Sequence, residues 1–169
     1  MIGNDVIDLK AAALESNPLR TGWADKIFSN EERRLLQASS DPALLSWKLW
    51  AVKESAYKAH IRCGGIPGFY PHKIVCNFEK RVALIGSHRY YFEIEHCHDR
   101  VSAYAVCDLR LLEKLTRVDR AEIVRKQGMP FVDLGGSLKP ASVSHHGNFY
   151  EAVTIDDEAW SIISGMQAR

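Results

Sequence analysis

A single long helix with clear start and stop signals most constrains how this chain can fold. Asp41 and Pro42 are typical of an N-cap and a first helical position, and a glycine pair at 64–65 supplies the stop. These signals predict a helix over residues 42–62. Apolar residues recur along it at the spacing of a stripe that faces a core. The stripe consists of Leu45, Leu49, Val52, Ala56 and Ala59.

The opposite face of this helix is not the charged face of an ordinary surface helix. It carries Trp47, Trp50 and Ala51, with Glu54 and Lys58 among them. A helix that is apolar on both sides is covered on both sides, so we expect Glu54 and Lys58 to be partly desolvated. An exposed Glu–Lys pair at this spacing contributes only about 0.2–0.5 kcal/mol to stability. A semi-buried carboxylate beside a lysine is instead a candidate for metal binding or proton transfer.

The rest of the chain mixes helical segments with runs typical of antiparallel strands. A short β-branched strand is expected at 2–9, and Ser29 with Glu32 forms an S-x-x-E capping box that opens a helix. Further strands are predicted at 73–78, 81–85, 90–95, 101–107 and 131–134, a closing hairpin at 141–145 and 150–155, and helices at 109–126 and from 157 onward. The pattern predicts a single α+β domain over 1–169, with the long helix packed on an antiparallel sheet.

Composition limits the classes of partner. The formal net charge of +1 argues against a nucleic-acid binder that depends on bulk positive charge. No apolar run approaches the length of a membrane span, and no basic leader precedes the first strand, so we expect a soluble cytoplasmic protein without a membrane partner. A zinc site built from His60 with Cys63, or from the His-Cys-His run at 96–98, is disfavoured because the cysteines lack CxxC spacing.

Two carboxylates near the start of the chain are candidate ligands for a divalent cation. Asp5 and Asp8 would point to opposite faces of an extended segment, so one of them paired with Glu54 is more plausible than both together. Magnesium prefers oxygen ligands and usually takes one or two carboxylates together with phosphate oxygens. The alternative is that Asp8 caps the following turn while Asp5 is solvated.

A second polar cluster, Ser142, Ser144 and His145, lies near the end of the chain. Two hydroxyls and an imidazole on a strand edge could donate to a phosphate. A Ser–His hydrolase is disfavoured, because no G-x-S-x-G elbow is present and neighbours on a strand face opposite ways. The alternative is an ordinary polar strand before a turn.

These clusters, in this order, resemble the motifs of the 4'-phosphopantetheinyl transferases. The resemblance covers G-N-D-V-I-D-L at 3–9, F-S-x-x-E at 28–32, W-A-V-K-E-S-A-Y-K at 50–58 and S-V-S-H at 142–145. The motif order and the Asp5–Asp8 spacing resemble the compact holo-acyl-carrier-protein synthase type. One departure is Gly-Met-Pro at 128–130, where compact members often have G-K-P. The lysine that contacts the phosphates therefore stays open.

The resemblance implies a magnesium-dependent enzyme that moves 4'-phosphopantetheine from coenzyme A to a serine of an apo acyl or peptidyl carrier protein. It implies that Asp5 and Glu54 hold Mg2+, with Asp8 assisting, and that Glu54 and Lys58 are catalytic. It further implies coenzyme A contacts from Ser144 and His145, with Lys53 and Lys139 as candidates for additional contacts.

Carrier proteins of this kind are acidic, so a basic docking face is expected. Candidates are Arg20, Arg33 and Arg34 in one patch and Arg117, Arg120, Arg125 and Lys126 in another. Compact members resemble trimers with sites between subunits, which favours a homo-oligomer. The alternatives are a non-catalytic module that binds coenzyme A or a carrier, and an unrelated metal-dependent phosphohydrolase. The carrier and its pathway stay open.

Overall fold

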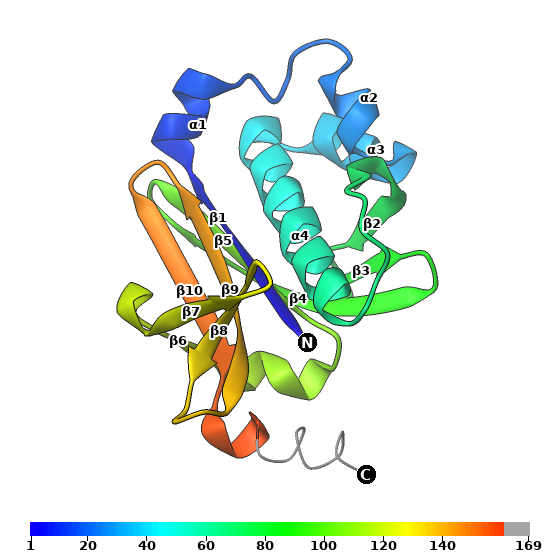
Figure 1. The fold of residues 1–169 in the computed structure, drawn as a ribbon. Coiled ribbons are helices and arrows are strands. Elements are labelled where there is room, and N and C mark those ends of the chain that lie inside the picture. The colour runs from blue at the N-terminus through cyan, green and yellow to red at the C-terminus, as the bar shows by residue number, and fades with distance from the viewer. Residues whose placement is uncertain (161–169) are drawn as a thin grey trace.

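The computed structural model describes residues 1–160, and within them two antiparallel sheets flank each other beside one long helix (Figure 1). The first sheet has the order β1-β5-β4-β3-β2 and the second the order β6-β10-β9-β8-β7. The strands of the first are β1 (Ile2–Asp8), β2 (Ile74–Asn77), β3 (Val82–Ile85), β4 (His88–Cys97) and β5 (Arg100–Val106). Those of the second are β6 (Leu115–Arg117), β7 (Ile123–Lys126), β8 (Met129–Asp133), β9 (Leu138–His146) and β10 (Phe149–Ile155).

Four α-helices lie in the first part of the described chain. They are α1 (Leu9–Glu15), α2 (Trp23–Ile27), α3 (Asn30–Ala38) and α4 (Pro42–Arg62), and short 3-10 turns follow at η1 (Pro71–Lys73), η2 (Leu109–Lys114) and η3 (Arg120–Glu122). The predicted start signals are confirmed: Asp41 caps α4 through Leu44, and Ser29 and Glu32 form the capping box of α3. No helix within residues 1–160 is long and apolar enough to cross a lipid bilayer.

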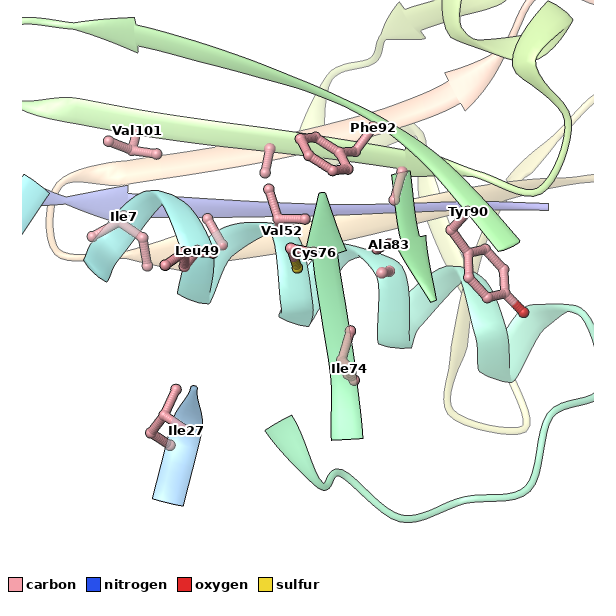
Figure 2. Close-up of a cluster of buried hydrophobic side chains, with 14 of the residues drawn as sticks. Ile7, Ile27, Leu49, Val52, Ile74, Cys76, Ala83, Tyr90, Phe92 and Val101 are labelled. Atoms are coloured by element: carbon pink, nitrogen blue, oxygen red, sulfur yellow. The ribbon is translucent and has the colours of Figure 1, made fainter. Parts of the chain in front are cut away.

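The core lies between α4 and the first sheet. Leu49 and Val52 of α4 are fully buried against Phe92 and Val101 of the sheet, with Ile7 of β1 beside them (Figure 2). On the other side of α4, Trp50 stacks on Trp23 of α2, with ring centroids 6.1 Å apart. The helix is therefore covered on both sides, and the predicted α+β arrangement is confirmed.

The predicted helix over 109–126 is wrong. This segment forms η2, β6, η3 and β7 instead. Strand β6 pairs with the edge of β10, and β7 pairs with β8 across a tight turn in which Gln127 and Gly128 both have positive φ. Pairing with strands later in the chain thus overrides local helix propensity. Of the helix expected from 157 onward, residues 157–160 are described and are helical. The rest of that prediction lies outside the described residues.

Candidate active site

Strand β1 packs against α4 at unusually close range, and Gly3 makes this possible. A Cβ at Gly3 would overlap the carbonyl oxygen of Ser55 and come within 2.6 Å of the Ala59 amide nitrogen. Only glycine permits such an approach of two backbones. Because side chains alternate along a strand, Asp5 then faces the helix on the same side as Gly3.

Asp5 meets Lys58 at this junction. The Lys58 Nζ lies 3.1 Å from Asp5 Oδ1 and also donates to the Asn4 carbonyl at 2.8 Å. The Ser144 hydroxyl of β9 donates to the same Asp5 Oδ1 at 2.8 Å. Every side-chain hydrogen bond that Asp5 makes within residues 1–160 goes to Oδ1, which leaves Oδ2 available to a ligand.

Glu54, one helical turn before Lys58, completes the cluster. Burial, and after it the negative charge of Asp5, raises the pKa of Glu54 to about 7, while Lys58 opposes this shift. The Glu54 side chain makes no hydrogen bond within the described residues. Asp5 and Glu54, distant in sequence, are therefore electrostatic neighbours, and their like charges make the ionised pair costly without a cation.

This donor set fits a hard divalent cation such as Mg2+. No group of three or more His, Cys, Asp or Glu side chains in residues 1–160 is arranged to hold a metal, so a cation at Asp5 and Glu54 would have two carboxylates. Magnesium is commonly bound by one or two carboxylates with water and substrate phosphates completing its octahedron.

Asp8 is not part of this cluster, so its predicted role as a metal ligand is not supported. Its Oδ1 accepts from the amides of Lys10 and Ala11, and its Oδ2 accepts from the backbone and side chain of Asn148. These bonds, above all that from the Asn148 backbone, lower the pKa of Asp8. Asp8 is the N-cap of α1, which was the alternative considered from the sequence.

Lys53 is likewise withdrawn from the predicted coenzyme A contacts. Its side chain is fully buried, and Nζ lies 2.8 Å from Glu32 Oε2 and donates to the carbonyls of Pro71 and Ile74. Glu32 in turn accepts from the Cys76 amide. Lys53 therefore ties α4 to α3 and β2 and has no contact with solvent through which to reach a phosphate.

The S-x-S-H segment joins the two sheets. Strand β1 has its free edge toward β9, where Ser142 Oγ accepts from Asn4 N, Ser144 Oγ from Val6 N and His146 Nδ1 from Asp8 N. The Ser144 hydroxyl donates to Asp5 Oδ1, so in this structure it orients that carboxylate. From the sequence, Ser142 and Ser144 were expected to donate to a phosphate, and His146 was missed. The alternation at 142, 144 and 146 is the sequence signal for this ladder.

With this geometry established, comparison with known proteins decides the family. A family model described as "ACPS: 4'-phosphopantetheinyl transferase superfamily" matches residues 1–107. This chain belongs to the 4'-phosphopantetheinyl transferase superfamily. The reaction class is therefore transfer of 4'-phosphopantetheine, and the resemblance to the compact synthase type is confirmed.

Solved structures agree in fold with this superfamily. The holo-[acyl-carrier-protein] synthase of Neisseria meningitidis is 22% identical, with a TM-score of 0.50, over 62% of this chain and 94% of that one. The corresponding synthase of Thermotoga maritima is 16% identical, with a TM-score of 0.50, over 90% of this chain and 81% of that one. No curated protein matches.

The two remaining residues predicted to contact coenzyme A, His145 and Lys139, lie in different environments. His145 is exposed and lines a cavity of about 470 Å³ together with Arg120, Arg125 and Tyr150. Lys139 is 5% exposed and pairs with Asp157, so its ammonium is already neutralised. Since His145 follows Ser144 in an extended strand, it faces away from Asp5.

A second cavity lies beside Lys58, the ion-pair partner of Asp5. It has a volume of about 320 Å³, and its lining includes Lys58, Arg62, Arg125 and the Gly128-Met129-Pro130 turn. The Arg62 guanidinium donates to the Pro130 carbonyl and lies 4.9 Å from the Phe131 ring centroid. Burial lowers the pKa of Arg62 to about 10, so it stays a cation at neutral pH. Sequence reasoning missed Arg62, although it lies one turn beyond Lys58 on α4.

Proposed function

We propose that this chain is a magnesium-dependent holo-carrier-protein synthase. It transfers 4'-phosphopantetheine from coenzyme A to a serine hydroxyl of an apo acyl or peptidyl carrier protein, and adenosine 3',5'-bisphosphate leaves. The observation that carries the proposal is the convergence of Asp5, Glu54 and Lys58 at the junction of β1 and α4. The similar proteins of Neisseria meningitidis and Thermotoga maritima are holo-[acyl-carrier-protein] synthases, which supports the proposal.

The nucleophile belongs to the carrier, so this chain must align the reactants and balance charge. Asp5 and Glu54 would hold Mg2+, which when bound supplies charge neutralisation at the pyrophosphate. Lys58 balances negative charge on the leaving phosphate, since its ammonium is partly exposed and lies beside the cavity. Arg62 offers a second cation along that cavity.

Glu54 is the proposed acceptor of the serine proton. A general base is most effective when its pKa is close to the working pH. A partly buried carboxylate without a hydrogen-bond partner in residues 1–160 is free to receive a proton. Ser144 acts on the reaction through Asp5, which it holds in place.

His145 and Arg120 are proposed to contact the coenzyme A phosphates from a second copy of the chain. The support is that Asp5 of β1 contacts the face of β9 that carries Ser144, whereas His145 points from the opposite face of β9. One coenzyme A therefore reaches both residues more readily between copies. Mixing the Glu54→Gln and His145→Ala variants tests this. Recovery of activity in the mixture is expected from a shared site, whereas an inactive mixture contradicts it.

The transfer itself is tested by incubating the protein with coenzyme A, Mg2+ and apo carrier proteins and measuring carrier mass. A carrier heavier by one phosphopantetheine group is the expected result. Coenzyme A binding with no mass gain on any of a panel of carriers would favour the non-catalytic module. Release of adenosine bisphosphate without a carrier would favour the phosphohydrolase.

A further inference from the structure

The β7–β8 hairpin is attached to the second sheet along only part of its length. Strand β8 pairs with β9 from Asp133 only as far as Phe131, which faces Pro140. Neither Pro140 nor Pro130, the next residue of β8 toward the turn, has an amide hydrogen with which to continue the ladder. Beyond this point the two strands part, and within residues 1–160 the strand pairing of the hairpin tip is between β7 and β8 alone.

A cavity lies in the space where β8 and β9 part. Its volume is about 320 Å³, and its walls include the turn at 128–130, residues 141–143 of β9, and Lys58 and Arg62 of α4. Arg125 of β7 also lines the cavity, and none of the described residues that line it is acidic. Arginine and lysine are common phosphate-binding side chains. The cavity therefore suits a phosphate-bearing ligand.

Arg62 ties the parted end of the hairpin to α4. Its guanidinium donates to the Pro130 carbonyl, and it lies 4.9 Å from the centroid of the Phe131 ring. These are the residues at which β8 leaves β9, and the turn beyond them, drawn in yellow in Figure 1, lies next to α4. A planar guanidinium can stack on an aromatic ring while its N–H groups donate. Arg62 therefore supplies an attachment where strand pairing has ended.

We propose that Arg62 is a positioning residue that holds the β7–β8 hairpin over the cavity beside Lys58, and so sets the affinity of that cavity for the pyrophosphate of coenzyme A. The inference rests on the proposed function and deepens it, because it gives the cavity a ligand group and a movable wall. Arg62 acts through Pro130 and Phe131, whereas Lys58 meets the ligand directly. With the hairpin held in place, binding does not have to order this wall.

Loss of this tie should weaken binding by reducing the fraction of molecules in which the cavity is formed. Apparent affinity falls in proportion to the fraction of the protein that is competent to bind. A hairpin that is in place about one tenth of the time would therefore bind coenzyme A about tenfold more weakly. The kcat at saturating coenzyme A should stay within about twofold, because the bound ligand selects the formed cavity.

The experiment measures coenzyme A binding by isothermal titration calorimetry, and amide hydrogen exchange of the full chain, for three variants. Arg62→Met keeps the apolar stem but removes the guanidinium, and Phe131→Leu removes the ring while leaving the Arg62 charge. Both should raise the Kd for coenzyme A, by about tenfold for Arg62→Met. Both should also speed exchange in residues 123–133 while α4 stays protected. Arg89→Met, at an exposed residue of β4, should do neither.

Three outcomes would overturn the proposal. An unchanged Kd in Arg62→Met would show that the hairpin does not shape the cavity. A raised Kd in Arg62→Met, with neither a raised Kd nor faster exchange in Phe131→Leu, would show that Arg62 acts by its charge alone. Faster exchange throughout α4 would assign the effect to a general loss of stability. Carrier mass gain by the unmodified protein is a separate measurement, so these results leave the proposed function intact, and an absence of transfer leaves the binding comparison intact.

Discussion

The Lys58 ammonium lies 3.1 Å from Oδ1 of Asp5, and this ion pair joins α4 to the first strand. Both residues depend on a third, Gly3, whose missing side chain lets β1 lie against the α4 backbone. The positions of the two carboxylates and the ammonium are thus set by backbone packing.

Gly3→Ala should therefore destabilise the fold and separate Asp5 from α4. The added methyl would overlap the Ser55 carbonyl, and overpacking of this kind costs about 1–3 kcal/mol, or more where backbone cannot yield. Urea denaturation measures the loss. Leu14→Ala, at an 89% exposed residue, is the control, and equal stability of the two variants would contradict the close approach.

Lys53→Met should destabilise the protein by about 3–5 kcal/mol, because it leaves Glu32 as a buried, unpaired charge. The same variant, assayed at low temperature where it is folded, should keep its KM for coenzyme A. A stable variant with a raised KM would restore Lys53 as a phosphate contact. Lys48→Met, on the same helix, serves as the matched control.

A segment of this fold could be predicted from the sequence where its structure depends on neighbouring residues, and not where it depends on distant strands. Helix α4 could be predicted because its cap residues and apolar spacing are local. The 109–126 segment could not, because β6 and β7 form only against strands that lie elsewhere in the fold. Strands β6 and β7 therefore depend on pairing that no short window encodes, whereas the local pattern over 73–107 predicted the strands that form β2 to β5.

The candidate site divides in the same way. The resemblance placed Asp5, Glu54 and Lys58 in one site, and their electrostatic contact in the structure agrees with it. Lys53 adjoins Glu54 in sequence, but its partner Glu32 comes from another helix, so motif membership alone could not assign its role. The sequence led us to expect a phosphate contact from Ser144, because a sequence does not reveal which group a hydroxyl bonds. In the structure that group is Asp5.

Ser144→Ala should lower kcat more than it raises the KM for coenzyme A, because it frees Asp5 and leaves the Val6 amide without an acceptor. The lost bonds should also cost about 1–3 kcal/mol of stability. Steady-state kinetics separates the two constants, and Ser137→Ala, in the exposed turn before β9, is the control. A raised KM with unchanged kcat would point to a direct phosphate contact instead.

Without a divalent cation, stability should fall as pH rises from about 4.5 to about 7. The pKa of Glu54 is raised in the folded protein, so the folded state binds more protons than the unfolded state across this window. The full shift corresponds to up to about 3 kcal/mol. Glu54→Gln should remove this contribution, and thermal melts at several pH values measure it. An unchanged pH profile in the variant would contradict a buried, charged Glu54.

Charge reversal at two exposed arginines, Arg20 in the turn before α2 and Arg34 within α3, should weaken carrier docking. We expect Arg20→Glu with Arg34→Glu to raise the KM for the carrier about tenfold while the KM for coenzyme A stays constant. Lys80→Glu, exposed in the turn between β2 and β3, should change neither constant. Equal effects of both changes would assign the result to net charge.

The most direct measurement of the central claim is carrier mass gain as a function of Mg2+ for the original protein and for Asp5→Asn, Glu54→Gln and Glu31→Gln. The account predicts metal-dependent transfer by the original protein and by Glu31→Gln, whose glutamate lies on α3, and loss of transfer in both other variants while they remain folded. Undiminished transfer by a folded Asp5→Asn or Glu54→Gln variant, or full transfer in a metal chelator, would contradict it.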